Sequence, residues 1–350
     1  MRASLVSRPW VGLDLGGFSV KLFALQPGMG TVRVLAAEAA YPVTTTADGA
    51  PTPEAVAQAI SACASRAGVS LRATRGITVG ISGSDVIVKQ IQLPLMDEVE
   101  VGQALRFEVR KHLPFDPQAM VIDYQVLGRY LSERRVDVLL AAVSREHLER
   151  HLAPLARLDL IADIVDAAPL ALTNALVHAA GGDRGAQLLL DIGHAASHLT
   201  LFQRGEPYFT RRLEFGGRHL TQAIATTLRI PFEKAEEWKL AAGSGEPGFL
   251  ADWAGRELHA AYEALEDDLV DEVRRSLAFY RTLGRLPDPL RLQLSGGTAR
   301  LPGIAEQLGN LLEFPVSVFD PFADLDGAAR AHVEGGPQFV QAYGLSLRNS

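Results

Sequence analysis

The sequence predicts an α/β fold made of two related halves, and three observations lead to this prediction. A short apolar run that ends in an aspartate-glycine turn occurs twice, within residues 11–19 and again within residues 188–196. Apolar runs of strand length alternate with helical patterns along most of the chain, which is typical of α/β proteins. The chain has 350 residues, more than a single hydrophobic core usually organises, so two or more domains are expected.

Each copy of the repeated turn has residues suited to bind phosphate and a divalent cation. Asp14 and Asp191 each end an apolar run, and the glycines that follow permit a tight turn before a second apolar run leads away. Backbone N–H groups of such a strand-turn-strand unit can bind phosphate oxygens, and the carboxylate can hold Mg²⁺ through water. Two such hairpins facing each other would clamp one nucleotide in a cleft between the halves. An ordinary hairpin turn without a ligand is the alternative.

The first half continues with elements that the apolar pattern and the turn residues delimit. A Thr-, Gly- and Pro-rich loop over 42–53 separates a strand from a capped helix, and a buried strand follows. After Ser84 a new series of strand, helix, strand, strand and helix begins, which predicts a small inserted module at about 85–160. The predicted elements of the first half are strands at 31–41 and 77–81 and a helix at 54–68; those of the insert are strands at 86–92, 120–129 and 136–144 and helices at 98–112 and 145–158.

A long apolar helix predicted over 166–180 leads into the second half, which opens with the Asp191 hairpin. A strand at 208–213 precedes a helix that starts near Arg218, after two glycines. The remaining predicted elements are further helices up to residue 283, a buried strand at 291–294, a glycine-rich turn with a helix up to residue 311, a strand at 316–319 and a last helix at 338–347.

Composition and charge exclude several classes of protein. Hydrophobic residues make up 47% of the chain and charged residues 21%, which is sufficient for packed cores. The net charge of −7 disfavours nucleic-acid binding, which needs basic surface. The single cysteine, Cys63, cannot form an internal disulfide, and we expect it to pack as a small apolar residue in a reducing compartment. The sequence contains no signal-peptide pattern and no uncharged apolar stretch of about 18 residues, so a cytoplasmic protein without a membrane span is expected.

Three motifs resemble those of the actin-like ATPase superfamily. Residues 14–17 resemble its first phosphate motif, residues 191–193 its second, and residues 294–297, followed by a helix, its adenosine motif. Each motif alone is short, but the three occur in the expected order and cover nearly the whole chain. The resemblance implies an actin-like ATPase fold, with two related halves around a nucleotide cleft.

One branch of that superfamily is more similar than the rest. The runs over 79–94, 112–116 and 121–127 and the pair Phe107-Glu108 are very similar to the type IV pilus assembly family PilM, a relative of the division protein FtsA. This resemblance implies four subdomains, including an inserted FtsA-type 1C subdomain. They are 1A at 1–84 and 161–183, with the C-terminal helix at about 338–350 packing back on it; 1C, the partner-binding insert, at 85–160; 2A at 184–229 and 286–337; and 2B at 230–285.

For function, the PilM resemblance implies a scaffold. Proteins of this family bind ATP or ADP in the cleft, with Mg²⁺ as the expected metal. A groove involving subdomain 1C holds the N-terminal cytoplasmic peptide of PilN, a single-span membrane protein. The adaptor is thereby held at the periphery of the inner membrane and links the PilN/PilO complex to the cytoplasmic motor ATPases. Whether two subunits form a homodimer is left open.

The resemblance also implies which residues bind nucleotide and metal. Asp14 and Asp191 would hold Mg²⁺ through water, because carboxylates at the ends of facing strands suit a hard cation beside phosphates. A helix start after Gly216 and Gly217 would bring N–H groups and the helix dipole to an anion, and a helix start without a ligand is the alternative. The predicted nucleotide-binding residues are Asp14, Gly16, Gly17, Phe18, Ser19, Lys21, Asp191, Gly193, His194, Ala195, Gly216, Gly217, Glu236, Lys239, Gly296, Gly297 and Arg300.

The adenosine side of this predicted site has its own pattern. Glu236 and Lys239 lie three residues apart on one helix face and match the superfamily's ribose and adenine contacts, with an ordinary surface ion pair as the alternative. Gly296 and Gly297 would let the backbone pass close to a flat adenine, and Arg300 would stack on it.

Two departures from the superfamily pattern predict slow or absent ATP hydrolysis. Residues 194–196 are His-Ala-Ala, where the superfamily usually has Gly, Ser or Thr, so hydroxyl donors to phosphate are missing. Ala168 stands before Pro169, where the superfamily tends to place a Glu or Gln that orients water, and Asp166 is the only acid nearby. Without such a group a rate factor of about 10² to 10⁴ is lost.

Two other functions stay open at this point. A small-molecule kinase of the same superfamily needs a catalytic aspartate in a substrate pocket, which the sequence does not locate. An FtsA-like filament-forming division or cytoskeletal protein would reach the membrane through an amphipathic C-terminal helix, whereas residues 348–350 end without a basic amphipathic tail. The histidines, including His147 and His151 at helical spacing, are expected to be structural or surface residues, because no zinc-protease glutamate accompanies them.

Overall fold

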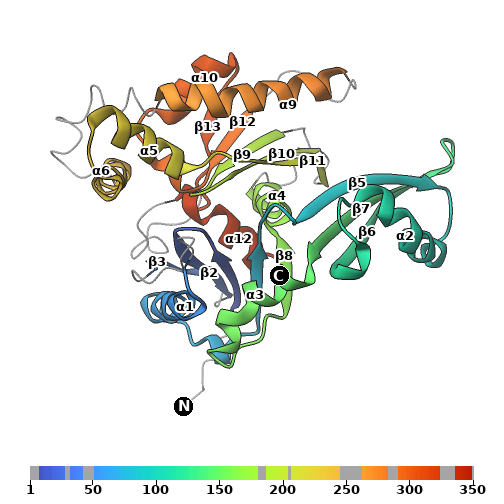
Figure 1. The fold of residues 1–350 in the computed structure, drawn as a ribbon. Coiled ribbons are helices and arrows are strands. Elements are labelled where there is room, and N and C mark those ends of the chain that lie inside the picture. Colours follow the sequence, from blue (N-terminus) through green and yellow to red (C-terminus); the bar gives the residue numbers. More distant parts are fainter. Residues whose placement is uncertain are drawn as a thin grey trace.

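The residues that the structure describes form three sheets, two of five strands and one of three (Figure 1). The computed structural model describes residues 8–27, 32–41, 51–179, 187–203, 206–244, 262–282, 291–323 and 336–348. Most of the predicted loop over 42–53, part of the predicted helical region at 245–261 and the chain end at 349–350 lie outside the described residues.

The first five-stranded sheet carries the first aspartate-glycine turn. Its strands are β1 (Trp10–Leu15), β2 (Ser19–Pro27), β3 (Val32–Ala40), β4 (Gly76–Ile81) and β8 (Ile164–Ala167), in the order β3-β2-β1-β4-β8. β2 pairs antiparallel with β1 and with β3, whereas β4 runs parallel to β1 and β8 parallel to β4. The parallel strands bring the ends of β1, β4 and β8 to one edge of the sheet, which is where open α/β sheets bind ligands.

The second five-stranded sheet repeats this arrangement. Its strands are β9 (Gln187–Ile192), β10 (Ser197–Gln203), β11 (Glu206–Leu213), β12 (Leu292–Ser295) and β13 (Val316–Val318), in the order β11-β10-β9-β12-β13. β10 pairs antiparallel with β9 and β11, whereas β12 runs parallel to β9 and to β13. Each pairing therefore has the direction of its counterpart in the first sheet, and the prediction of two related halves is confirmed.

The three-stranded sheet is built by the segment between β4 and β8, and it extends away from the two large sheets (Figure 1). Its elements are β5 (Ile87–Pro94), α2 (Glu98–His112), β6 (Met120–Tyr130) and β7 (Arg135–Ser144), with the antiparallel strand order β5-β7-β6. α2 packs on one face through Val101, Leu105 and Val109, which are spaced four residues apart as one side of a helix requires. Asp97 and Glu100 form a capping box that starts this helix.

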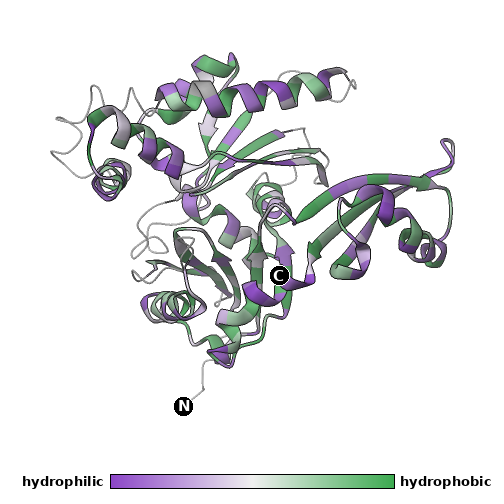
Figure 2. Ribbon diagram, in the orientation of Figure 1, coloured by the Kyte–Doolittle hydropathy of each residue, from purple (hydrophilic) through white to green (hydrophobic). Residues whose placement is uncertain are grey.

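Several helices begin and end at residues whose side chains explain the boundary. α1 (Pro53–Ala67) starts after Thr52, whose hydroxyl accepts the N–H of Ala55 at 3.2 Å, and ends at Gly68, which has a φ of +65°. α9 (Asp271–Thr282) alternates hydrophilic and hydrophobic residues, as expected for a helix with one face on a core (Figure 2). The other described helices of four or more residues are α3 (Arg145–Ala156), α4 (Ala168–Ala179), α5 (Gly217–Leu228), α6 (Phe232–Ser244), η3 (Leu265–Val270), α9 (Asp271–Thr282), η4 (Gly297–Arg300), α10 (Ile304–Leu312) and α12 (Val340–Ser346).

One predicted element is wrong at its start. The helix predicted over 166–180 begins only at Ala168, because Asp166 lies on β8 and pairs with Gly80 of β4. A short apolar run of this kind is compatible with either a strand or a helix, and the choice depends on which partner is available. Here the free edge of β4 provides the partner, and the strand forms.

Core residues from both large sheets and from the last helix hold the two halves together. One cluster of buried side chains includes Phe23 of β2, Leu189 of β9 and Tyr343 of α12. α12 approaches its neighbours closely through glycine. A methyl group on Gly344 would lie 1.8 Å from a carbonyl oxygen of α4, and one on Gly12 would lie 2.1 Å from a carbonyl oxygen of α12. The last helix is therefore wedged between α4 and β1.

Cys63 is buried on α1, as predicted, and its thiol lies 3.2 Å from the carbonyl oxygen of Val20. Burial raises the pKa of this thiol to about 12, so it stays protonated and unreactive.

Within the described residues, no helix combines the length and the apolar character needed to cross a bilayer.

Candidate functional site

The two aspartate-glycine turns have the same hydrogen-bonded shape. In each turn, the N–H of the glycine two positions after the aspartate donates to the carbonyl oxygen three positions further on. The two bonds are Gly16 to Ser19 at 3.2 Å and Gly193 to Ala196 at 3.1 Å. The same local sequence pattern has thus produced the same backbone turn in both halves.

The two turns also face each other, and they meet at one cavity of about 780 Å³. The rings of Phe18 and His194, one from each turn, contact each other with centroids 5.4 Å apart. Every predicted nucleotide-binding residue except Gly216 lines this cavity. Its size lies within the range of about 300–1,000 Å³ that is usual for small-molecule sites.

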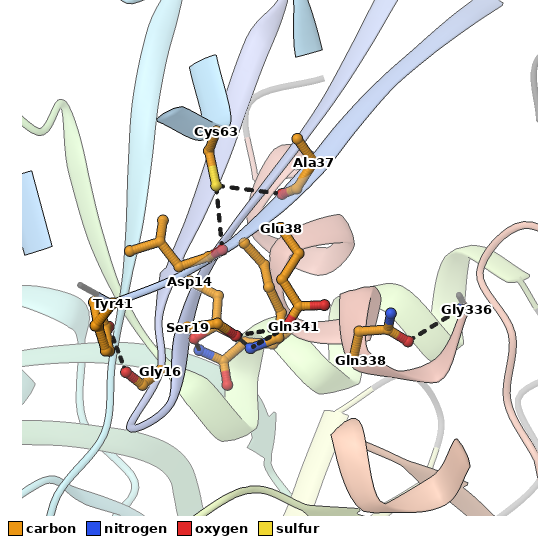
Figure 3. Close-up of polar contacts among 12 residues, drawn as sticks. Asp14, Gly16, Ser19, Ala37, Glu38, Tyr41, Cys63, Gly336, Gln338 and Gln341 are labelled. Carbon is orange, nitrogen blue, oxygen red and sulfur yellow. Dashed lines mark hydrogen bonds and ion pairs between the residues drawn. The ribbon is translucent and has the colours of Figure 1, made fainter. Parts of the chain in front are cut away.

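Asp14, at the end of β1, lies in a buried polar network (Figure 3). Its Oδ1 accepts a hydrogen bond from Gln341 Nε2 at 3.0 Å, and its Oδ2 lies 3.6 Å from Lys21 Nζ. Glu38 accepts from Ser19 Oγ at 2.5 Å and lies 3.9 Å from the Lys21 ammonium. Burial lowers the pKa of Lys21, but the surrounding carboxylates raise it above its ordinary value, so this lysine stays charged. Burial raises the pKa of Asp14, although Lys21 opposes the shift.

Asp191, at the end of β9, is the counterpart of Asp14 in the second half. Its Oδ1 accepts from Ser295 Oγ at 2.7 Å. Burial raises the pKa of Asp191 to about 6, which the Ser295 hydrogen bond and Lys21 oppose and Asp14 reinforces. Both aspartates are only 8% exposed.

This donor set fits a hard divalent cation beside phosphate oxygens. A cation between Asp14 and Asp191 would favour their ionised forms and offset the cost of burying two carboxylates. Within the described residues, no group of three or more His, Cys, Asp or Glu side chains is arranged to enclose a metal. The two aspartates could hold such a cation together with water and phosphate oxygens.

Gly216, which does not line the cavity, lies behind the second turn. A methyl group on Gly216 would lie 2.5 Å from the carbonyl oxygen of His194, so glycine lets α5 pack against the turn. The N–H groups of Gly217 and Arg218 donate to the carbonyl oxygens of Gly193 and His194 at 2.8 and 2.9 Å. The first N–H groups of α5 thus hold the turn in shape, whereas the sequence pattern predicted that they receive an anion.

Glu236 and Lys239 of α6 form a buried ion pair, and the alternative of a surface pair is wrong. Their side chains are 12% and 7% exposed, with Lys239 Nζ 2.8 Å from Glu236 Oε2. The same ammonium donates to the carbonyl oxygen of Gly217 at 2.9 Å and to Thr221 Oγ1 at 2.7 Å. Burial lowers the pKa of Lys239, and Glu236 restores only part of the shift. The pair joins α6 to the start of α5 at the cavity wall.

The turn after β12 also lines the cavity, next to α6. Gly296 has a φ of +89°, and a methyl group there would lie 2.4 Å from the carbonyl oxygen of Ile192. A methyl group on Gly297 would meet no atom within 4 Å. Arg300 packs against Gly243 of α6, where a methyl group would lie 3.5 Å from the Arg300 Cβ. Gly296, Gly297 and Arg300 thus border the cavity beside α6.

Sequence reasoning missed several residues that other elements contribute to the cavity. Tyr41 donates through its hydroxyl to the carbonyl oxygen of Gly16 at 2.5 Å (Figure 3). Glu38 had a recognisable signal, because it is the only charge in the second half of an apolar strand, but Gln341 had none. Other missed residues that line the cavity include Ser82, Gly83, His147, Arg150, His151, Arg212, Thr298 and Gln338.

Asp166, the only acid near the expected water-orienting position, does not line the cavity. It is 4% exposed, and its Oδ2 lies 3.3 Å from Arg348 Nε. Burial raises its pKa to about 6, although Arg348 opposes the shift. Ala168 is fully buried in α4. Neither residue provides a polar group to the site.

Two matched sheets whose aspartate-glycine turns meet at one cavity define a protein of the actin-like ATPase fold. The chain belongs to the type IV pilus assembly protein PilM family, whose sequence profile matches residues 12–350. It is similar to a chain of the solved PilM-PilN type IV pilus biogenesis complex, with a TM-score of 0.80, 28% sequence identity and 99% of each chain covered. The family predicted from the sequence is confirmed.

The chain is also similar to bacterial division proteins. The cell division protein FtsA of Streptococcus pneumoniae is 23% identical over a region that covers 95% of this chain and 80% of that relative. FtsA of Borreliella burgdorferi is 22% identical over 46% of this chain, and the match spans 42% of that relative's length. These similarities confirm the predicted relation to FtsA.

Proposed function

We propose that this chain is an ATP- or ADP-binding adaptor of the type IV pilus assembly machine. One observation carries the proposal: residues predicted to contact phosphate, metal and adenosine come from both halves of the chain and line a single cavity. Membership of the PilM family supports the place of the adaptor in pilus assembly.

The nucleotide would lie with its phosphates between the two turns and its adenosine between α6 and η4. Asp14 and Asp191 would hold Mg²⁺ through water, and the Lys21 ammonium would offset phosphate charge. Lys239 and Arg300 would border the nucleoside. Calorimetric titration with Mg²⁺-ADP tests this arrangement, and we expect saturable binding of one nucleotide per chain. Absence of heat with both ADP and ATP would contradict it.

We expect ATP turnover to be slow. The turn after Asp191 offers no hydroxyl at residues 194–196, and the buried Asp166 lies outside the cavity. Gln341 lines the cavity, but its amide already donates to Asp14. Phosphate release measured under saturating Mg²⁺-ATP is predicted to stay below about 1 per second, under the median of about 10 per second for enzymes. A faster steady rate, free of contaminating ATPase, would refute this expectation.

The partner we propose is the N-terminal cytoplasmic peptide of PilN, held in a groove that involves residues 85–160. A solved relative is a PilM-PilN complex, which supports this choice. The insert also exposes large apolar side chains in a way that suits docking of a peptide. Those in the insert that are at least about one-third exposed are Leu95, Val99, Phe107, Phe115, Tyr124 and Leu131.

A peptide titration tests the partner and the surface separately. The first ten or so residues of the PilN encoded beside this protein are titrated with and without ATP, and we expect micromolar binding. Phe107 of α2 is 76% exposed, and Phe107→Ser is predicted to weaken peptide binding several-fold. Phe279→Ser is the matched control, since this residue is 57% exposed on α9, outside the insert. Absence of binding to the wild type under both conditions counts against the adaptor, whereas equal affinities of the two variants count only against this face.

Through PilN the adaptor would lie at the periphery of the inner membrane and connect the PilN/PilO complex to the motor ATPases. Co-purification of a motor ATPase with this protein only when PilN is present is the expected outcome.

An FtsA-like filament is the second candidate, because one FtsA matches over 95% of the chain. Sedimentation with Mg²⁺-ATP separates the two, and we expect this protein to remain in the supernatant.

A further inference from the structure

The insert joins the rest of the molecule through two connections, and one carboxylate binds both. Asp85 lies on the entry, two residues before β5, and its Oδ1 lies 2.5 Å from Nδ1 of His147 on α3, which is the exit. The other oxygen of Asp85 accepts from Ser144 Oγ. Ser144 in turn accepts the N–H of His147 at 3.2 Å, as the cap of α3. We call Asp85, Ser144 and His147 the clasp.

His147 brings the clasp to the wall of the cavity, beside the first turn. β1 and β4 run parallel with Asp14 paired to Gly80, so the chain after β4 emerges next to the turn after Asp14. His151, one turn along α3, donates through Nε2 to the carbonyl oxygen of Gly80 at 2.8 Å. A methyl group on Gly83 would lie 2.4 Å from His147 Cε1, so only glycine leaves room for the ring. His147 and His151 both line the cavity.

The groups at this wall can recognise an anion. Asp85 holds the Nδ1–H of His147, and no hydrogen bond joins the Nε2 of that ring to any residue that the structure describes. Arg150 also lines the cavity, and its only described ion pair is a 3.7 Å contact with Glu146 in which the two side chains are 68% and 89% exposed. An exposed pair of this kind is weak, so the guanidinium is available. An imidazole fixed by a carboxylate next to a guanidinium suits phosphate oxygens.

We propose that His147 and Arg150 recognise the terminal phosphate of a bound nucleoside triphosphate, and that the clasp transmits this contact to the insert. The proposal rests on the nucleotide site proposed above and adds a discrimination between triphosphate and diphosphate. The phosphate contact would restrain α3, and Asp85 would then restrain the entry to β5. The three-stranded sheet would thus be held more firmly when the triphosphate is bound.

Nucleotide affinities test the first part. Dissociation constants for Mg²⁺-ATP and Mg²⁺-ADP are measured calorimetrically for the wild type, His147→Gln and Arg150→Ala. Each substitution is expected to weaken ATP about tenfold, as for loss of a charge-assisted hydrogen bond, and to change ADP less than about twofold. His112→Gln in α2 and Arg145→Ala on α3 are matched controls, because neither residue lines the cavity. An unchanged ratio of ATP to ADP affinity in both variants overturns the proposal.

Hydrogen exchange tests the second part. In the wild type, saturating ATP is expected to slow amide exchange in β5, Ile87–Pro94, more than saturating ADP does. Asp85→Asn keeps the shape of the side chain but removes its charge, and we expect it to abolish the difference between the two nucleotides in β5. The same difference in the variant as in the wild type overturns the transmission through the clasp. A wild type that binds neither nucleotide would instead overturn the nucleotide site itself, and this inference with it.

Discussion

Replacing Asp191 by asparagine is expected to stabilise the unliganded protein at neutral pH and to abolish its response to Mg²⁺-nucleotide. Burial raises the pKa of this carboxyl from 3.8 to about 6, a shift that the Ser295 hydrogen bond and Lys21 reduce and Asp14 increases. A carboxyl with a higher pKa in the folded than in the unfolded chain contributes stability that is fully present below about pH 3.8. That contribution is lost as the pH rises through about 6.

The size of the effect follows from the same shift. At about 1.4 kcal/mol per pH unit, the interval from 3.8 to about 6 amounts to about 3 kcal/mol of lost stability well above pH 6. Asparagine stays neutral, and its side-chain oxygen can still accept a hydrogen bond from Ser295 Oγ. In the wild type this hydroxyl lies 2.7 Å from Asp191 Oδ1. We therefore expect Asp191→Asn to raise the free energy of unfolding by about 3 kcal/mol at pH 7.5 and to have little effect near pH 4.

Urea unfolding at both pH values, with and without Mg²⁺-ADP, provides the assay. A ligand at 100 times its dissociation constant stabilises the wild type by about 2.7 kcal/mol, and the variant is expected to lose this gain. Asp166→Asn is the matched control, because burial also raises the pKa of Asp166 to about 6 but the residue lies outside the cavity. The control is expected to keep the full nucleotide response. A less stable Asp191→Asn protein at pH 7.5, or one with the wild-type response to Mg²⁺-ADP, would refute the reasoning.

Two further substitutions test how the cavity walls are held. Lys239→Met leaves the buried Glu236 carboxylate without its ammonium partner, which is expected to lower the free energy of unfolding in urea by about 3–5 kcal/mol. The double variant with Glu236→Gln is expected to recover most of this stability. A loss below about 1 kcal/mol in the single variant would contradict the burial of this pair. Gly296→Ala is expected to destabilise the protein, because the residue has a φ of +89° and the new methyl group would lie 2.4 Å from a carbonyl oxygen of β9. Gly297→Ala is the control, because a methyl group there meets no atom within 4 Å, and it should leave the midpoint of thermal unfolding unchanged. Equal midpoints for the two variants would show that the close approach of Gly296 to the carbonyl oxygen of Ile192 is not required.

Much of the fold could be predicted because its signals act over a few residues. Thr52 caps α1 by accepting the N–H of Ala55, and Asp97 and Glu100 cap α2 reciprocally, so both helix starts are readable in the printed sequence. The repeated turn forms the same backbone hydrogen bond in both halves because the same residue pattern follows each aspartate. Asp166 shows where this reasoning ends. Its strand exists through pairing with β4, and no residue near Asp166 signals that partner.

The candidate site divides in the same way. The motif residues around Asp14 and Asp191 were recognisable because a turn that can bind phosphate needs only a strand, a carboxylate and glycine in succession. Whether the two turns share a cavity depended on the packing of one sheet against the other, and Gly216 shows that a plausible local motif can support the backbone instead of lining the site.

The residues that complete the site could be found only in three dimensions. Glu38 reaches Ser19 because β3 pairs with β2, and Gln341 reaches Asp14 across 327 positions of chain because glycines let α12 pack on β1. His147 meets Asp85 because the inserted sheet returns the chain to its point of departure. Local chemistry specifies turns, caps and the residue types that can bind a phosphate. Long-range strand pairing and close backbone packing decide which of those groups meet, because the free energy of such contacts depends on partners that no short window of sequence contains.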